Sequence, residues 1–144
     1  MKNLTKRKYS GIRQRNVNET VWNLYGYKFF KNEDCFYNLV EMAREDLEGY
    51  NFDVVIPIKP RNSGSDIVLR LATKIAEFTG ATLVDCLNNS NTATTKKLSS
   101  RGYAVLIVDD VITSGRTAAK AEKAISTTKP ASIRFYAIAK ANMK

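Results

Sequence analysis

The sequence predicts an α/β protein built on an open, doubly wound parallel β-sheet with helices on both faces. Short apolar runs rich in β-branched residues lie at 54–58 and 105–108, and such runs are typical of strands buried on both faces. Stretches with the apolar period of a helix alternate with them, as in successive strand–helix–strand units. Polar, glycine-containing loops follow the two strongest runs. Such loops meet at the carboxyl edge of an open sheet, where ligands bind.

The composition is that of one ordinary globular domain. The chain has 144 residues, of which 44% are hydrophobic and 26% charged, which suffices for its own core. We expect a single domain over 1–144, with a basic arm and a small N-terminal hood in 1–33 and the core in 34–144. No apolar run approaches the roughly 20 residues of a membrane span. We therefore expect a cytoplasmic protein without a membrane partner.

The reactive residue types exclude several classes of enzyme. The chain has no histidine, so Ser-His and Cys-His nucleophilic catalysis are excluded. Its two cysteines, Cys35 and Cys86, lack the spacing of a zinc site or a disulfide framework. Two thiols without such a role are typical of a reducing cytoplasm.

The first half of the chain predicts a cover for the sheet and then a helix. Segment 21–30 is aromatic and predicts a short strand or hairpin at a sheet edge. Asn32 can cap the helix that follows, and Gly49 can end it. Five apolar residues repeat at helical spacing between them: Phe36, Leu39, Val40, Ala43 and Leu47.

A strand–helix–strand unit follows. Residues 53–58 predict a buried strand, and a turn-rich loop leads to a second helix that Ser65 or Asp66 caps and Gly80 ends. Residues 81–87 predict the next strand.

Segment 87–102 is polar, rich in Asn, Ser and Thr, and carries Lys96 and Lys97. So long a structureless connection is uncommon in a compact domain and favours a lid or binding loop. The two lysines either reach a ligand when this lid closes or remain solvated loop charges.

The densest signal is VLIVDDVITSGRT, residues 105–117. Its apolar run predicts a central strand, and Asp109 and Asp110 follow at the ligand-binding edge. A helix should occupy 117–126, and the last strand 131–139. Backbone N–H groups at a helix start, beside hydroxyls and a cation, bind anions such as phosphate. Five residues supply these groups: Thr113, Ser114, Gly115, Arg116 and Thr117.

The loop after strand 53–58 predicts a second anion site. It combines cations, a hydroxyl and an amide with a glycine that lets the backbone approach a ligand. Its residues are Lys59, Pro60, Arg61, Asn62, Ser63 and Gly64. Since both loops follow parallel strands, they should face each other across one crevice. A ligand with phosphate at each end and hydroxyls between them fits this arrangement.

Residues 105–121, VLIVDDVITSGRTAAKA, resemble the phosphoribosyl-pyrophosphate (PRPP) signature of type I phosphoribosyltransferases. The shared pattern is an aliphatic strand, two acids, two variable residues and hydroxyl-Gly-x-hydroxyl. Residues 53–76 are similar to the pyrophosphate-loop strand and helix of the ComF-like branch, and 133–141 looks like the last strand of the family. The resemblance extends over about 34–141.

The resemblance implies transfer of ribose 5-phosphate from PRPP to a nucleobase-like acceptor, with release of pyrophosphate. It implies that 113–117 bind the 5′-phosphate, that Asp109 and Asp110 bind the ribose hydroxyls, and that 59–64 bind pyrophosphate. Mg²⁺ would arrive with PRPP and contact the two acids only through water. Lys96 or Lys97 would reach the leaving group on lid closure. We also expect a homodimer.

Departures from the family pattern narrow the acceptor. Thr113 stands where 6-oxopurine transferases carry an acid that acts on the purine, which disfavours hypoxanthine and guanine. The histidine of the orotate enzymes and the cysteine zinc element of ComF-like proteins are both absent. The hood would recognise the acceptor. Its aromatic residues either stack a base or pack in the core: Trp22, Tyr25, Tyr27, Phe29 and Phe30.

The net charge of +9 calls for an acidic partner. Part of the excess lies in an N-terminal arm, through Lys2, Lys6, Arg7, Lys8, Arg13 and Arg15. This arm either keeps the protein soluble or binds nucleic acid weakly and in a salt-dependent way. The alternative function is therefore a PRPP-sensing regulator, or a nucleic-acid-associated protein on the same fold, without turnover.

Overall fold

The computed structural model describes residues 17–60, 65–95, 101–112 and 114–140. Helices and strands in this part of the chain follow the order α2 (Val17–Phe30), α3 (Glu33–Asp46), β1 (Val54–Pro57), α4 (Ile67–Thr79), β2 (Thr82–Leu83), β3 (Ala104–Ile112), α5 (Arg116–Ser126) and β4 (Ser132–Lys140).

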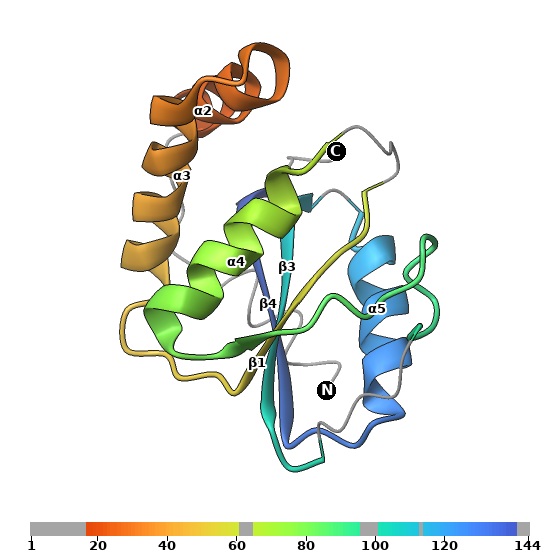
Figure 1. The fold of residues 1–144 in the computed structure, drawn as a ribbon. Helices are drawn as coiled ribbons and strands as arrows, with labels where there is room; N and C mark the ends of the chain where they lie inside the picture. Colours follow the sequence, from red (N-terminus) through yellow and green to blue (C-terminus); the bar gives the residue numbers. More distant parts are fainter. Residues whose placement is uncertain (1–16, 61–64, 96–100, 113, 141–144) are drawn as a thin grey trace.

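The four strands form one parallel sheet in the order β2-β1-β3-β4. The chain first extends the sheet from β1 to β2, then returns to the other side of β1 and extends it from β3 to β4. The two crossover helices, α4 and α5, consequently lie on opposite faces (Figure 1). The predicted open, doubly wound sheet is confirmed. Its topological switch point lies between β1 and β3, and ligands of such folds bind at the carboxyl ends of these strands.

The core is formed by the strands and by the apolar faces of the helices. All four residues of β1 are buried, as is the apolar run of β3 from Val105 to Val108. Helix α3 begins as predicted, because Asn32 accepts a hydrogen bond from the Cys35 backbone N–H. Helix α4 ends at Gly80, whose φ of 75° is left-handed, a conformation that glycine adopts without strain. Cys35 and Cys86 are buried free thiols.

The predicted strand or hairpin at 21–30 is wrong, because this segment belongs to helix α2. Leu24 and Tyr27 are buried, whereas Trp22, Tyr25 and Phe29 are exposed. Both sets follow helical spacing, so the helix has apolar residues on two faces and lacks the one-sided pattern that identifies most helices. Tertiary packing on α3 then outweighs the β-propensity of the aromatic residues. Helix α2 lies in the predicted hood segment, 1–33, and packs on α3.

The α2–α3 contact depends on Gly26. A Cβ atom at this position would clash with Sγ of Cys35 on α3 and lie 3.3 Å from the Cβ atom of the same residue. We expect Gly26→Ala to lower the free energy of unfolding by roughly 1–3 kcal/mol through overpacking. In a Cys35→Ala background the cost should be smaller, because the clash with Sγ is removed and only the 3.3 Å approach to Cβ of residue 35 remains, against the higher helix propensity of alanine. Urea unfolding of the four proteins measures both effects, and a gain from Gly26→Ala alone would contradict the packing.

Two strands differ in length from their predictions. Strand β2 covers only Thr82 and Leu83 instead of 81–87, because the chain then leaves the sheet edge. Strand β3 runs to Ile112, so the two acids lie inside the strand and not after it. Strand β4 extends equally far, pairing Lys140 with Ile112, and this pairing explains the extra length.

Candidate functional site

The switch point brings together the two segments that the sequence singled out. Pro57 at the end of β1 pairs with Val108 of β3, and the Ile58 N–H donates to the Val108 carbonyl at 2.9 Å. The loop after β1 therefore begins beside Asp109. Seven of the predicted site residues lie outside the described residues: Arg61, Asn62, Ser63, Gly64, Lys96, Lys97 and Thr113. Their roles stay predictions.

Asp109 and Asp110 are both half-buried near the end of β3. The Asp110 N–H donates to Oδ1 of Asp109 at 2.8 Å, and the Val111 N–H donates to Oδ1 of Asp110 at 2.7 Å. Each carboxylate is thus turned back onto the backbone of the next residue. These bonds hold the two acids side by side, although successive side chains of a strand usually point to opposite faces.

A cation of the hood contacts this acid pair. Nζ of Lys28, in the last turn of α2, forms an ion pair with Oδ2 of Asp110. The side chain of Lys28 is 32% exposed and that of Asp110 16%, so water only partly screens their attraction. Sequence reasoning missed Lys28, because a lysine in an aromatic segment carries no motif.

The two acids have opposite pKa shifts. Burial raises the pKa of Asp109 to about 7, and the neighbouring charge of Asp110 adds to the effect. Burial also disfavours the charged form of Asp110, but the hydrogen bond and charge of Lys28 outweigh it and lower the pKa of that carboxyl. Of the two acids, Asp110 therefore ionises first, and Asp109 is the one that more readily keeps a proton.

The predicted phosphate cradle lies directly after β3. Gly115 precedes α5 with a φ of 83°, in the left-handed region that favours glycine. The Arg116 N–H donates to Oγ of Ser114 at 3.3 Å, and both residues are exposed. Helix α5 begins at Arg116, one residue before its predicted start. Gly115 supplies no capping side chain, and the first-turn N–H groups of a helix without such a cap are typical ligands of an anion.

The loop after β1 is held by contacts that the sequence did not predict. Nζ of Lys59 lies 2.7 Å from Oδ1 of Asp85, which follows β2. The Lys59 backbone donates to Oδ1 of Asn91 at 2.8 Å and accepts from its Nδ2 at 3.1 Å. A predicted pyrophosphate cation is thus paired within the protein. Pro60, the next residue, is exposed.

The first part of the predicted lid is an ordered turn. Leu87 and Thr94 form an antiparallel bridge, and Oδ1 of Asn88 accepts from the N–H groups of Thr92 and Ala93 at 2.9 and 3.3 Å. Asn91 at its tip is buried and has a left-handed φ of 59°, which asparagine tolerates better than most residues.

We expect Asn91→Gly to release the loop after β1. Glycine adopts the left-handed φ without strain, but it leaves the Lys59 N–H and carbonyl without their side-chain partner. This loss should lower the free energy of unfolding by roughly 1–3 kcal/mol. Hydrogen exchange of the Lys59 amide should accelerate with it. Asn89→Gly, at an exposed position in the same turn, controls for the added chain entropy. Equal effects of the two substitutions would contradict the role of Asn91.

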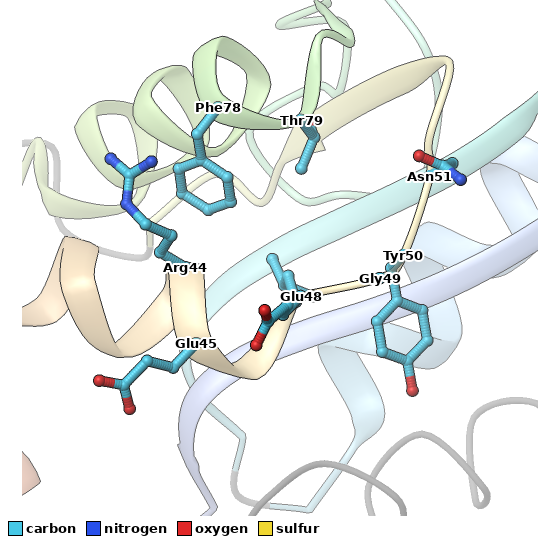
Figure 2. Close-up of a pocket in the computed structure, with 9 residues that line it drawn as sticks. Arg44, Glu45, Glu48, Gly49, Tyr50, Asn51, Phe78 and Thr79 are labelled. Atoms are coloured by element: carbon cyan, nitrogen blue, oxygen red, sulfur yellow. The ribbon is translucent and has the colours of Figure 1, made fainter.

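A hollow of about 410 Å³ lies elsewhere, between the C-terminal ends of α3 and α4 (Figure 2). Arg44 lies over the ring of Phe78 at 4.9 Å on one side of it, and Tyr50 and Asn51, which precede β1, line the other. It is therefore at the amino end of β1, away from the two acids at the carboxyl end.

No helix of the described segments is long and apolar enough to cross a membrane. Within the same segments, no group of three His, Cys, Asp or Glu side chains could hold a metal ion.

The chain belongs to the phosphoribosyl transferase domain family, whose pattern matches residues 37–144. This agrees with the parallel sheet and with two acids followed by the predicted phosphate cradle at its switch point. A search of curated proteins found no match. The resemblance to the ComF-like branch gains no support from these comparisons.

Solved structures of this fold include enzymes of purine and pyrimidine metabolism. An adenine phosphoribosyltransferase superposes with a TM-score of 0.59 at 18% identity, covering 78% of this chain and 74% of the other. The Saccharomyces cerevisiae adenine phosphoribosyltransferase gives 0.57 at 16%, covering 78% and 72%. Orotate phosphoribosyltransferase from Aeropyrum pernix gives 0.57 at 14%, covering 77% and 74%. At these identities the likeness establishes the fold.

Proposed function

We propose that the protein transfers ribose 5-phosphate from PRPP to a nucleobase-like acceptor and releases pyrophosphate. The observation that carries this proposal is the placement of Asp109, Asp110 and the Gly115 turn on one strand end at the switch point. Two acids suit the vicinal hydroxyls of a ribose, and exposed N–H groups at a helix start suit its 5′-phosphate.

The chemistry would be electrostatic and positional. Cleavage of the anomeric C–O bond leaves positive charge on the sugar and negative charge on pyrophosphate. Asp110, ionised through its contact with Lys28, would stabilise the sugar cation. The α5 N-terminus would fix the 5′-phosphate, so that the anomeric carbon is held for the incoming acceptor. Lys59, together with the loop residues Arg61 to Gly64, would face the pyrophosphate once Lys59 leaves Asp85.

The donor set at the acids fits Mg²⁺ that arrives on the substrate. Lys28 occupies Oδ2 of Asp110, and burial disfavours the charged form of Asp109, so neither carboxylate is arranged as a direct ligand. Substrate phosphates are common Mg²⁺ ligands. When bound, Mg²⁺ would neutralise part of the charge that develops on the departing pyrophosphate.

Five finer assignments complete the proposal. The similarity of residues 53–76 supports a place near the ComF-like branch, and the chain would function as one domain and as a homodimer. The free thiols Cys35 and Cys86 support a cytoplasmic location. The basic arm, residues 2–15, would bind nucleic acid only weakly.

One observation favours a second candidate, a PRPP-binding regulator without turnover. Two predicted ligand groups already have partners within the protein: Asp110 pairs with Lys28, and Lys59 pairs with Asp85. A ligand would have to rearrange these ion pairs, which a sensor can use as a switch.

Pyrophosphate release separates the two candidates. The protein is incubated with PRPP, Mg²⁺ and a panel of purine and pyrimidine bases, and each reaction is compared with its Asp109→Asn/Asp110→Asn counterpart. If the protein is an enzyme, the wild type releases pyrophosphate with at least one base, and the doubly substituted protein releases none. Saturable PRPP binding with no release across the panel would establish the sensor in its place.

A further inference from the structure

The last turn of α2 contacts both segments that flank the candidate site. Lys28 reaches Asp110 on β3. One residue earlier, the Tyr27 hydroxyl donates to Oδ1 of Asp66 at 2.8 Å, and Asp66 immediately precedes α4 at the end of the loop after β1. Lys31 lies 3.5 Å from the same oxygen. Figure 1 shows α2 at the end of the molecule where β3 and β4 finish.

These contacts fix the hood helix in place. Arg70 of α4 donates to the Tyr27 hydroxyl at 3.0 Å and to both carboxylate oxygens of Glu33 on α3, at 2.8 and 3.0 Å. Such a bidentate pair has a defined geometry. Asp66 makes no capping bond to its own helix, since its side chain is turned toward Tyr27. The position of Lys28 over the acids therefore follows from a network of three helices.

Lys28 has a specific electrostatic effect on the acids. Within the described residues, its ammonium is the one cation in an ion pair with either Asp109 or Asp110. With Oδ2 of Asp110 held by Lys28 and Oδ1 by the Val111 N–H, the orientation of this carboxylate is set from both sides. Two adjacent carboxylates without a cation would repel each other and retain a proton.

We propose that Lys28 is a positioning residue of the PRPP site. Lys28 orients Asp110 and keeps it charged for the ribose hydroxyls. Recognition of the ribose therefore depends on the docked hood. This role rests on the proposed function. It differs from a direct contact between Lys28 and substrate phosphate, and from a purely structural tie between α2 and β3, because the effect of Lys28 passes through Asp110.

A double-mutant cycle on PRPP affinity tests this dependence. Calorimetry with PRPP and Mg²⁺ compares wild type, Lys28→Met, Asp110→Asn and the double variant. We expect Lys28→Met to weaken PRPP binding about tenfold in the wild-type background, the effect of one hydrogen bond to a charged group. In the Asp110→Asn background it should change affinity by less than about twofold. Equal losses in both backgrounds would overturn the proposal.

Two further variants control for charge. Lys28→Arg keeps the cation and should retain PRPP affinity within about threefold. Lys74→Met removes the same charge from α4, where Lys74 pairs with the exposed Glu77, and should leave affinity unchanged. A loss in Lys74→Met as large as in Lys28→Met would reduce the role of Lys28 to net charge and would contradict the proposal.

Urea unfolding of the same four cycle proteins, without ligand, separates this proposal from the proposed function. If the effects of the two single substitutions on the unfolding free energy do not add up to that of the double variant, the Lys28–Asp110 contact exists in the free protein. If they do add up, the role of Lys28 is overturned, whatever the PRPP titrations show. A wild-type chain that shows the coupling but binds no PRPP would overturn the proposed function, and with it the link to ribose, while the ion pair itself would stand.

Discussion

Gly115→Val is expected to lower PRPP affinity by more than about a hundredfold while the protein remains folded. Residue 115 has a φ of 83° at the start of α5, where a β-branched side chain is strained and would change the turn that presents the N–H groups. Calorimetry with PRPP and Mg²⁺ measures the loss, and circular dichroism checks the fold.

Gly80→Val is the matched control for this substitution. Gly80 has a φ of 75° at the end of α4, and a Cβ there meets nothing within 4 Å. The control therefore has a similar backbone strain but lies away from the predicted cradle, and it should retain PRPP affinity. A folded Gly115→Val protein with unchanged affinity would show that the cradle does not hold the phosphate.

The second large effect concerns the acid pair. Asp109→Asn with Asp110→Asn should reduce turnover by more than about a thousandfold, since the Asp110 charge that would stabilise the sugar cation and the carboxylates that would bind the ribose hydroxyls are lost. Stability should change far less, because the two single substitutions act in opposite directions. Asparagine keeps the oxygens that accept from the backbone at 2.8 and 2.7 Å.

The sign of each stability effect follows from its pKa shift. The pKa of Asp109 is raised to about 7 from 3.8, so between about pH 4 and pH 7 the unfolded chain loses a proton that the folded chain keeps, and stability falls as pH rises. Asp109→Asn removes this loss and should gain on the order of 4 kcal/mol over wild type at pH 8 relative to pH 4.

Asp110 behaves in the opposite way. Its pKa is lowered, so it contributes stability above its unfolded value of 3.8, and this contribution is lost as pH falls through the folded pKa. Asp110→Asn should therefore destabilise the protein at pH 8 and leave Lys28 without its partner. Thermal unfolding of both single variants at pH 4 and pH 8 checks the two signs. Turnover that survived the double substitution would remove both acids from the reaction.

The elements that the sequence predicts well are those with a strong local pattern. The β1 and β3 strands contain apolar, β-branched runs that are typical of a doubly covered sheet. Asn32 and Gly80 mark helix ends, Asn32 through its capping side chain and Gly80 through its left-handed φ. The order of these elements and the loops after β1 and β3 are enough to place the switch point, and with it the predicted crevice.

The parts that were missed depend on partners distant in sequence. Lys28 and Asp110 are 82 positions apart, and the Asn91 clamp on Lys59 joins residues 32 positions apart, so no local pattern reveals them. Tyr27, weighed as a base-stacking residue, is instead buried and bonded to Asp66. Helix α2 was missed for a related reason. It has apolar residues on two faces, and only its packing on α3 determines which of these faces is buried.

Calorimetric titration of the wild-type protein with PRPP in the presence of Mg²⁺ tests the central claim most directly. The account predicts saturable binding of one PRPP per chain, weaker binding of ribose 5-phosphate alone, and loss of both in Gly115→Val but not in Gly80→Val. Two results would contradict it. One is the absence of saturable heat with PRPP up to about 1 mM, a concentration that corresponds to a binding free energy of only about 4 kcal/mol. The other is equal PRPP binding by the two glycine variants.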